Sequence, residues 1–266
     1  MVDVSGTNNG DNLQGTSVAD VIRGLGGNDS ILGGAGDDRL VGGEGNDSLD
    51  GEYGNDKLFG GNGDDWLYDW DGGNDQLYGE SGDDHLHVQR FYSHSANTIV
   101  LDGGAGDDTI EYGSAVYIVD RVTVSGGEGN DVITVAPTAK AVIDAGTGND
   151  KVNVAMGGLN QTITLGAGAD TFKITGTPYS TIRDVVRVTD FNTAEDRVDL
   201  TDIIGYLQNW DGSTNPFATG HLQLVQSGAD SIFQIDRDGN GDNWTDLAIF
   251  EGVPTTGLNL DGFIIG

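Results

Sequence analysis

The chain has 266 residues, no cysteine, 43 acidic against 12 basic side chains, and a net charge of −31. Such an acidic chain repels phosphate groups, which argues against nucleic acid and anionic membranes as partners. The lack of cysteine excludes disulfides and thiolate chemistry. No apolar run reaches transmembrane length, and the N-terminus lacks the features of a secretory signal peptide. The chain therefore either stays in the cytosol or is exported by a route that reads another segment.

A nonapeptide, Gly-Gly-x-Gly-x-Asp-x-Leu-x, repeats in one frame from Gly6 to Tyr68. One inserted residue near Asp69 shifts the phase, and the repeat then resumes. The sixth-position aspartates of this part of the chain are Asp11, Asp20, Asp29, Asp38, Asp47, Asp56, Asp65, Asp75 and Asp84. Asp favours turns in general, but that preference alone would not keep it at one position of every repeat. The strict phase therefore predicts a repeat architecture.

Each repeat predicts its own local structure. Glycines at its first, second and fourth positions permit a tight turn, and the last three residues form a short strand with one inward apolar side chain. These inward residues are Leu13, Ile22, Ile31, Leu40, Leu49, Leu58, Leu67, Leu77 and Leu86. With two repeats per coil, we expect an all-β fold: a right-handed parallel β-roll solenoid with a row of turns along each edge.

One buried apolar side chain per repeat is little to set against the entropy of ordering the repeat. The aspartates stacked along an edge also repel one another. A divalent cation between successive turns adds ligand bonds and removes this repulsion, so the repeat predicts rows of hard-cation sites.

Beyond Val88 the signature continues at 103–111, 126–134, 145–153 and 165–173, now spaced by about one coil. Its aspartates are Asp108, Asp131, Asp150 and Asp170. We therefore expect one edge to keep its aspartates throughout, from Asp11 to Asp170, and the other to lose them after Asp75. With one ion per pair of neighbouring turns, the ceiling is eight plus three, or about eleven. Val18 and Trp70 stand in turns with poor glycine positions (15–20 and 70–75), so these turns are the first candidates to fall below that ceiling.

Three domains are expected: a regular roll with ion turns on both edges (1–88), a continued roll with ion turns on one edge (89–180), and a C-terminal cap (181–266). The first segment of the cap, 181–204, contains no glycine. The cap sequence predicts a strand, a short helix at 201–207, a hairpin at 221–235 around Gly228, and two strands within 247–265. Such a mostly-β unit would close the open end of the solenoid.

An acidic loop in the cap, DRDGNGDNWTD (236–246), matches the start of an EF-hand loop at Asp236, Asp238 and Asn240. Leu247 stands where the EF-hand has its final glutamate, so a complete EF-hand is not expected. A looser Ca²⁺ loop that adds Asp242, and a plain acidic turn, are both compatible with the sequence.

Other motifs carry less chemistry. Trp66 and Tyr68 should be exposed on one sheet face, where they either bind sugar or a partner or, as we favour, cover the inserted residue. His85, His87 and His94 form only a weak metal cluster. The chain has no HExxH, GxSxG or phosphate-binding loop, so no catalytic residues are assigned and no enzyme is expected.

The repeats GGAGDDRLV, GGEGNDSLD and GGNGDDWLY resemble the RTX, or hemolysin-type calcium-binding, nonapeptides of secreted Gram-negative proteins. The resemblance covers about residues 6–175. It implies a parallel β-roll that binds Ca²⁺ through the sixth-position carboxylates and the turn carbonyls. The turn glycines implicated in this way are Gly34, Gly36, Gly43, Gly45, Gly61, Gly63, Gly104, Gly106, Gly127 and Gly129.

The segments GADTFKI, VTDFNTAEDRVDL, IDRDGNGDNWTDLAIFEGV and LDGFIIG resemble the C-terminal target region of type I secretion substrates. This resemblance implies export through a type I exporter, which reads an uncleaved C-terminal signal, and an extracellular protein that folds when it meets Ca²⁺. Three roles remain open: a module of a giant adhesin, a module of a lipase, protease or polysaccharide epimerase with carbohydrate binding, and a complete protein that acts on a host surface.

Overall fold

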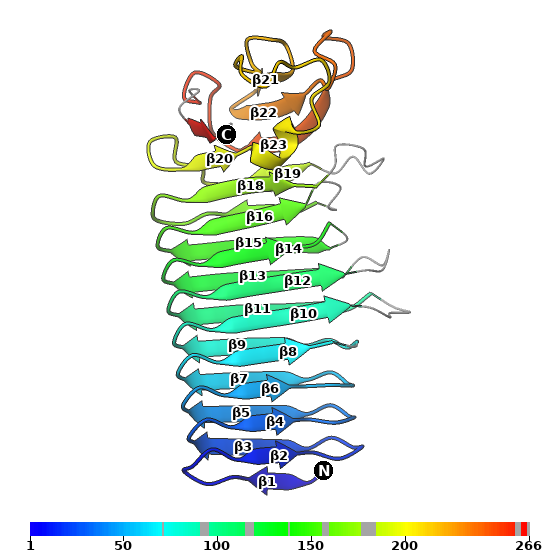
Figure 1. Cartoon of the computed structure of the whole chain (residues 1–266), viewed down its shortest axis with the longest axis vertical. Helices are drawn as coiled ribbons and strands as arrows, with labels where there is room; N and C mark the ends of the chain where they lie inside the picture. Colours follow the sequence, from blue (N-terminus) through cyan, green and yellow to red (C-terminus); the bar gives the residue numbers. More distant parts are fainter. Residues whose placement is uncertain are drawn as a thin grey trace.

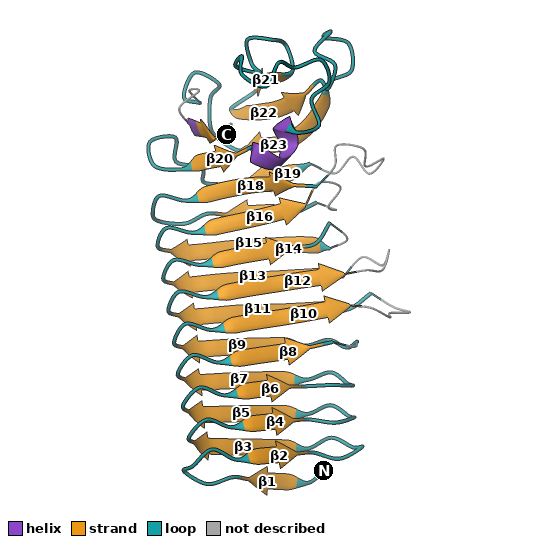
Figure 2. Ribbon diagram, viewed as in Figure 1, coloured by secondary structure: helices purple, strands orange, loops and turns teal. Residues whose placement is uncertain are grey.

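A computed structural model describes residues 1–70, 72–90, 96–114, 120–137, 139–155, 160–176, 185–258 and 262–264. It shows an elongated all-β solenoid with the N-terminus at one end and a smaller cap at the other (Figures 1 and 2). The expected parallel β-roll is confirmed. No helix within the described ranges is long and apolar enough to cross a membrane.

Two sheets face each other along the solenoid, and successive strands alternate between them. The first sheet contains, in spatial order, β1 (Asp3–Ser5), β3 (Val21–Gly26), β5 (Arg39–Glu44), β7 (Lys57–Asn62), β9 (Gln76–Ser81), β11 (Thr98–Ala105), β13 (Arg121–Glu128), β15 (Lys140–Thr147), β17 (Thr162–Thr164), β19 (Val186–Val188), β23 (Thr245–Phe250), β22 (Asp230–Ile235) and β21 (Leu222–Ser227). The second contains β2 (Asn12–Gln14), β4 (Ser30–Leu32), β6 (Ser48–Asp50), β8 (Trp66–Asp69), β10 (His85–Arg90), β12 (Thr109–Ser114), β14 (Val132–Val135), β16 (Lys151–Ala155), β18 (Thr171–Thr175), β20 (Arg197–Asp199) and β24 (Phe263–Ile264).

The register of the strands reproduces the repeat. In the regular part, Ile22 pairs with Leu40 and Leu40 with Leu58, so one coil consumes two nonapeptides. The predicted inward side chains are fully buried from Ile22 to Leu86, whereas Leu13, in the first coil, is partly buried. Identical positions thus stack into one apolar column per sheet.

The roll widens beyond β8. There the second sheet gains a second inward column, in which Val88, Tyr112, Val135, Val154 and Ile174 pair in register from strand to strand. All five side chains are buried. Later coils therefore bury about twice as many apolar side chains on this sheet as the regular coils do, and they depend correspondingly less on other sources of stability.

The cap continues the first sheet. β23 runs parallel to β19, and β22 and β21 add antiparallel strands. The hairpin turns at Gly228, whose φ is 66°, as the sequence predicts. The helix α1 (Thr201–Ile204) is shorter than the predicted 201–207, because Gly205 follows it and favours helix termination. Phenylalanines cover the end of the core, with Phe191 packed on Phe250 at 4.8 Å between ring centroids.

Candidate calcium-binding turns

Turns at the two edges of the roll form two rows. Those that lead from the first sheet to the second, such as 24–29 between β3 and β4, form the long row at the left edge of Figure 1. Those that lead back, such as 33–38 between β4 and β5, form the short row at the opposite edge. The topology therefore separates the aspartates into the two rows that the repeat phase predicts.

A ladder of hydrogen bonds joins the aspartates of each row. The amide of Asp29 donates to Oδ1 of Asp47, one coil further on, and the amide of Asp47 donates to Oδ1 of Asp65, both at 2.7 Å. The long ladder has the members Asp11, Asp29, Asp47, Asp65, Asp84, Asp108, Asp131, Asp150 and Asp170. The short ladder has Asp20, Asp38, Asp56 and Asp75. Except at Asp11, the first member of the long ladder, each Oδ1 thus accepts a hydrogen bond, and this bond fixes the direction of its carboxylate.

The second oxygen of these carboxylates has no partner over most of both rows. Among the described residues, the buried Oδ2 atoms without a hydrogen bond are those of Asp29, Asp47, Asp65, Asp84, Asp108, Asp131, Asp150 and Asp170 in the long row and Asp38, Asp56 and Asp75 in the short row. A buried anionic oxygen without a partner is costly. Carboxylate oxygens beside turn carbonyls are the donor set that Ca²⁺ takes, so these residues fit that ion.

Burial raises the pKa of several metal-free ladder carboxylates into the neutral range. It raises the pKa of Asp65 to about 7 and that of Asp84 to about 8, and the charges of neighbouring aspartates add to the rise although a backbone amide hydrogen bond opposes it. Asp108 and Asp150 reach about 7 for the same reasons. A cation entering these turns must therefore displace protons.

The ends of the rows are satisfied by the protein itself. Oδ2 of Asp11 accepts hydrogen bonds from the amide and hydroxyl of Thr7, and Oδ2 of Asp20 accepts them from those of Thr16. Burial alone would raise the pKa of Asp20, but these bonds outweigh it and lower that pKa. The turn that contains Val18 thus has no unsatisfied carboxylate oxygen.

The long ladder continues one step beyond the predicted set. The amide of Asp170 donates to Oδ1 of Asp196 at 3.1 Å, and the amide of Asn192 donates to Oδ2 of Asp196 at 2.7 Å. The sequence did not identify Asp196 because its turn, DFNTAED, contains no glycine. The available signal was its position: Asp196 lies one coil after Asp170 and is followed by a predicted strand.

The turn glycines adopt the conformation that the motif requires. The ten predicted positions all have φ between 105° and 137°, in the region open chiefly to glycine. At Gly43 a side chain is also excluded by space, because a Cβ there would lie 2.4 Å from the carbonyl oxygen of Leu25 in the preceding turn. Turn backbones therefore approach one another closely, although the role of their carbonyls as ligands remains a prediction.

A second ladder, which the sequence reasoning missed, occupies the fifth position of the repeat. The amide of Asn46 donates to Oδ1 of Asn28 at 3.0 Å, and the amide of Asp64 donates to Oδ1 of Asn46 at 3.2 Å. These bonds run from a later turn to an earlier one, opposite to the aspartate ladder. The recurrence of Asn or Asp at this position was the available signal.

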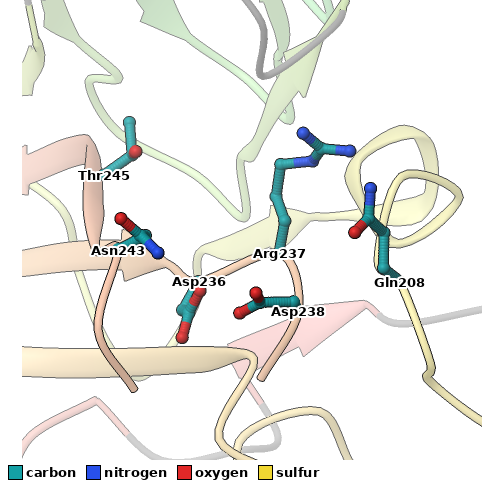
Figure 3. Close-up of a pocket in the computed structure, with 6 residues that line it drawn as sticks. All are labelled: Gln208, Asp236, Arg237, Asp238, Asn243 and Thr245. Carbon is teal, nitrogen blue, oxygen red and sulfur yellow. The ribbon is translucent and has the colours of Figure 1, made fainter. Parts of the chain in front are cut away.

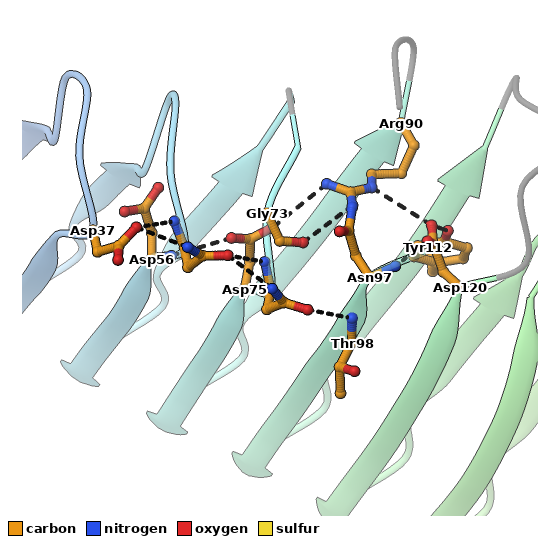
Figure 4. Close-up of polar contacts among 11 residues, drawn as sticks. Asp37, Asp56, Gly73, Asp75, Arg90, Asn97, Thr98, Tyr112 and Asp120 are labelled. Atoms are coloured by element: carbon orange, nitrogen blue, oxygen red, sulfur yellow. Dashed lines mark hydrogen bonds and ion pairs between the residues drawn. The ribbon is translucent and has the colours of Figure 1, made fainter. Parts of the chain in front are cut away.

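The short row ends at a buried arginine (Figure 4). Arg90 is fully buried, and its guanidinium lies 3.6 Å from Oδ2 of Asp75 on one side and 3.6 Å from Oδ2 of Asp120 on the other. It also donates to the carbonyl of Gly73 at 3.1 Å. Asp120 in turn accepts hydrogen bonds from the Tyr112 hydroxyl and from the amide of Asn97. Much of the later short-row turns, at 91–95, 115–119, 138 and 156–159, lies outside the described residues, as does His94.

In the cap, the predicted acidic loop converges on one point beside a pocket (Figure 3). Carboxylate oxygens of Asp236, Asp238 and Asp242 all lie within 4.8 Å of one another. Oδ1 of Asp236 is buried without a hydrogen bond, and its Oδ2 accepts one from the amide of Gly241 at 2.5 Å. Asn240 instead donates its side-chain amide to Asp238 at 2.9 Å. The arrangement fits the looser Ca²⁺ loop, whose occupancy remains a prediction.

Aromatic and histidine side chains gather on the outer face of the second sheet. Trp66 is 50% and Trp70 40% exposed, and Tyr68 between them is partly buried, so the outward orientation is as expected. Trp66 packs at a tilt against His85 at 4.5 Å, and Trp70 against His87 at 5.2 Å, between ring centroids. Nδ1 of His87 lies 2.9 Å from the Glu111 carboxylate.

Comparison with known proteins agrees with this geometry. The RTX calcium-binding nonapeptide repeat family matches residues 5–40, 32–67, 71–88, 100–115 and 122–135. These segments of the chain are therefore RTX calcium-binding nonapeptide repeats, and proteins with such repeats are typically secreted. No curated protein matches its sequence.

Several solved structures are similar to this chain, among them two subunits of one epimerase and a lipase. The R3 subunit of a mannuronan C5-epimerase from Azotobacter vinelandii has 21% identity and a TM-score of 0.24 over 60% of this chain and 78% of that one. The R2 subunit has 18% identity and a TM-score of 0.26 over 62% and 91%. The extracellular lipase of Serratia marcescens has 15% identity and a TM-score of 0.25 over 95% of this chain, which spans 39% of the lipase.

Proposed function

We propose that this chain is a secreted calcium-binding RTX β-roll, or a module of that kind, which folds when it binds Ca²⁺ after export through a type I exporter. The observation that carries the proposal is the set of eleven buried Oδ2 atoms without a hydrogen bond, eight in the long row and three in the short row. In each of these aspartates, Oδ1 already accepts a hydrogen bond from a backbone amide of the ladder. A row of buried carboxylates held in fixed orientations provides ligands for a row of cations.

The chain's own groups define how each site would work. An amide one coil earlier holds Oδ1 of each aspartate, as Asp47 is held by Asp29, and leaves Oδ2 directed into its own turn. Ca²⁺, when bound, supplies positive charge and further ligand bonds between turns. Because the ladder links each turn to the next, occupancy of one turn orders the carboxylate of its neighbour, and folding should be cooperative along the row.

Folding that depends on Ca²⁺ would allow export of the unfolded chain. In a cytosol poor in Ca²⁺ the chain would remain unfolded and could be threaded through an exporter, and Ca²⁺ outside the cell would then drive folding. The C-terminal segment from residue 181 is the proposed export signal, and a Gram-negative bacterium the proposed host. Under this proposal the roll stabilises and carries, without catalysis, either a complete secreted protein or the end of an adhesin or exoenzyme.

Calcium stoichiometry tests the proposal directly. Titration of the chelator-treated full-length chain, followed by calorimetry and by equilibrium dialysis, should give about eleven ions in the roll, plus one if the loop at Asp236 is filled. Mg²⁺ should not substitute, since it demands near-octahedral geometry and retains water. Absence of Ca²⁺ binding at millimolar concentration would overturn the proposal.

A second candidate activity is carbohydrate binding by the aromatic face. We propose it because the rings of Trp66, Tyr68 and Trp70 follow one another at 5.7 and 6.1 Å between centroids, with both tryptophans exposed. Flat exposed rings in a row suit stacking with successive sugars. Trp66→Ala should weaken binding to an acidic polysaccharide such as alginate about tenfold or more, whereas Tyr53→Ala, elsewhere on the surface, should not. Equal binding by wild type and Trp66→Ala excludes this role.

A further inference from the structure

The inserted residue Asp69 lies inside the roll. The strand β8 alternates regularly through the insertion, so Trp66 and Tyr68 face outward and Asp69 faces inward, with 1% of its surface exposed. Asp69 pairs with Val88 of β10. It therefore occupies the first place in the inward column that Val88, Tyr112 and the later coils fill with apolar side chains. A carboxylate at the head of an apolar column requires a specific partner.

Asp69 joins two carboxylates of the short row. Oxygens of Asp56, Asp69 and Asp75 lie within 4.8 Å of one another, and all three residues are buried. Neither oxygen of Asp69 has a hydrogen bond, and the Oδ2 atoms of Asp56 and Asp75 have none either. A Cβ on Gly51 would lie 2.8 Å from Oδ2 of Asp56 and 3.0 Å from Oδ2 of Asp69, so both oxygens point to the same space beside that glycine.

The surrounding charges match one cation. Three carboxylates carry −3, and the Arg90 guanidinium divides its +1 between Asp75 and Asp120, with 3.6 Å to an Oδ2 atom of each (Figure 4). The three carboxylates therefore keep most of their negative charge, which a divalent or trivalent cation would offset. Arg90 stands on the far side of Asp75, between it and Asp120, where the next ion of the row would otherwise be needed. The guanidinium thus closes the row, and the ion belongs between Asp56 and Asp75.

We propose that Asp56, Asp69 and Asp75 form a three-carboxylate site for a hard cation, distinct from the other turns because its third anionic ligand comes from a strand. The inference rests on the proposed calcium function. Ligand charge is a main determinant of Ca²⁺ affinity. Among the described residues of the roll, this is the one group of three buried carboxylates brought together in this way. The site therefore binds Ca²⁺ most tightly and prefers a trivalent lanthanide of similar size.

Asp69→Asn in the full-length chain tests the proposal, because asparagine keeps the shape of the side chain and removes its charge. In Ca²⁺ titrations, the tightest binding phase of the wild type should weaken about tenfold or disappear, with the remaining ions unchanged. Asp144→Asn, the same change at an exposed position of β15, is the matched control and should leave every phase intact.

Terbium supplies a second measurement that does not depend on a variant. The first equivalent of Tb³⁺ added to the Ca²⁺-loaded wild type should release one Ca²⁺ and give luminescence sensitised by tryptophan, and Asp69→Asn should lose this preference. If the wild type binds Ca²⁺ but Tb³⁺ spreads evenly over all sites, or if Asp69→Asn retains the tightest phase, the three-carboxylate site is wrong. If the wild type binds no Ca²⁺, the proposed function itself is wrong.

Discussion

Removal of Ca²⁺ at neutral pH is expected to abolish most of the β-sheet signal of this chain in far-UV circular dichroism. In the metal-free roll, eleven buried Oδ2 atoms of the two aspartate rows have no hydrogen bond, and successive turns of each row are hydrogen-bonded neighbours. In the regular coils each half-coil buries only one apolar side chain, whose stabilisation must offset the repulsion between the carboxylates. Addition of Ca²⁺ should restore the signal cooperatively, with a midpoint of about 10⁻⁴–10⁻³ M, as in other extracellular modules.

A pair of adjacent substitutions separates ion binding from general charge reduction. Asp108→Asn neutralises a buried ladder carboxylate whose Oδ2 is free, so the Ca²⁺ midpoint should rise several-fold, on the order expected for loss of a charged ligand. Asp107→Asn makes the same change one residue earlier, at the exposed fifth position of the repeat. The next two turns of the long row have asparagine at this position, Asn130 and Asn149, so the change should have little effect. A β-rich spectrum in excess chelator, or equal midpoints for the two variants, would contradict calcium-driven folding.

The regular part of the fold could be predicted from the sequence because each repeat specifies its own environment. Ile22, Leu40 and Leu58 recur at intervals of one coil, so their stacking follows once two repeats per coil are recognised. The division of the aspartates into a long and a short row follows from the same count. Local chemistry and global fold agree at these positions, and pattern reasoning succeeds there.

Residues outside the pattern could not be placed in this way. Asp196 continues the long ladder from a turn without glycine, and Asp69 looked like an irregularity of phase when it is an inward carboxylate. Arg90 is an ordinary basic residue in the sequence, and its burial between Asp75 and Asp120 depends on contacts across coils. A repeat pattern predicts what is repeated, whereas these three residues act where the repetition stops.

The ends of both rows share one physical solution. Hydroxyl and amide groups satisfy the first carboxylate of each row, through Thr7 and Thr16, and the amide of Asn192 satisfies the last carboxylate of the long row. Arg90 ends the short row with a fixed positive charge. Beyond it, the second apolar column that begins with Val88 supplies burial to coils whose turns on that edge lack the glycine–aspartate motif. Ion binding and apolar burial thus replace one another along the solenoid.

Proton competition should make calcium-driven folding depend steeply on pH. In the metal-free fold, burial raises the pKa of Asp65 and Asp150 to about 7 and that of Asp84 to about 8, from an ordinary value of 3.8. Between about pH 4 and pH 7 to 8, the folded metal-free chain therefore binds more protons than the unfolded chain. Its stability is greatest below the unfolded pKa and is lost as the pH rises through about 7 to 8.

Calcium reverses this dependence, because the ion must displace the protons that the buried carboxylates hold. The midpoint Ca²⁺ concentration should fall as the pH rises from 5 to 8, by about tenfold per pH unit for each proton released per ion. Circular dichroism midpoints at fixed ionic strength measure it. As a control for the two imidazoles on the outer sheet face, the variant His85→Gln with His87→Gln should show the same slope as the wild type. A midpoint that does not change with pH would mean that the aspartates are already ionised before the metal arrives, and that desolvation is not what the ions relieve.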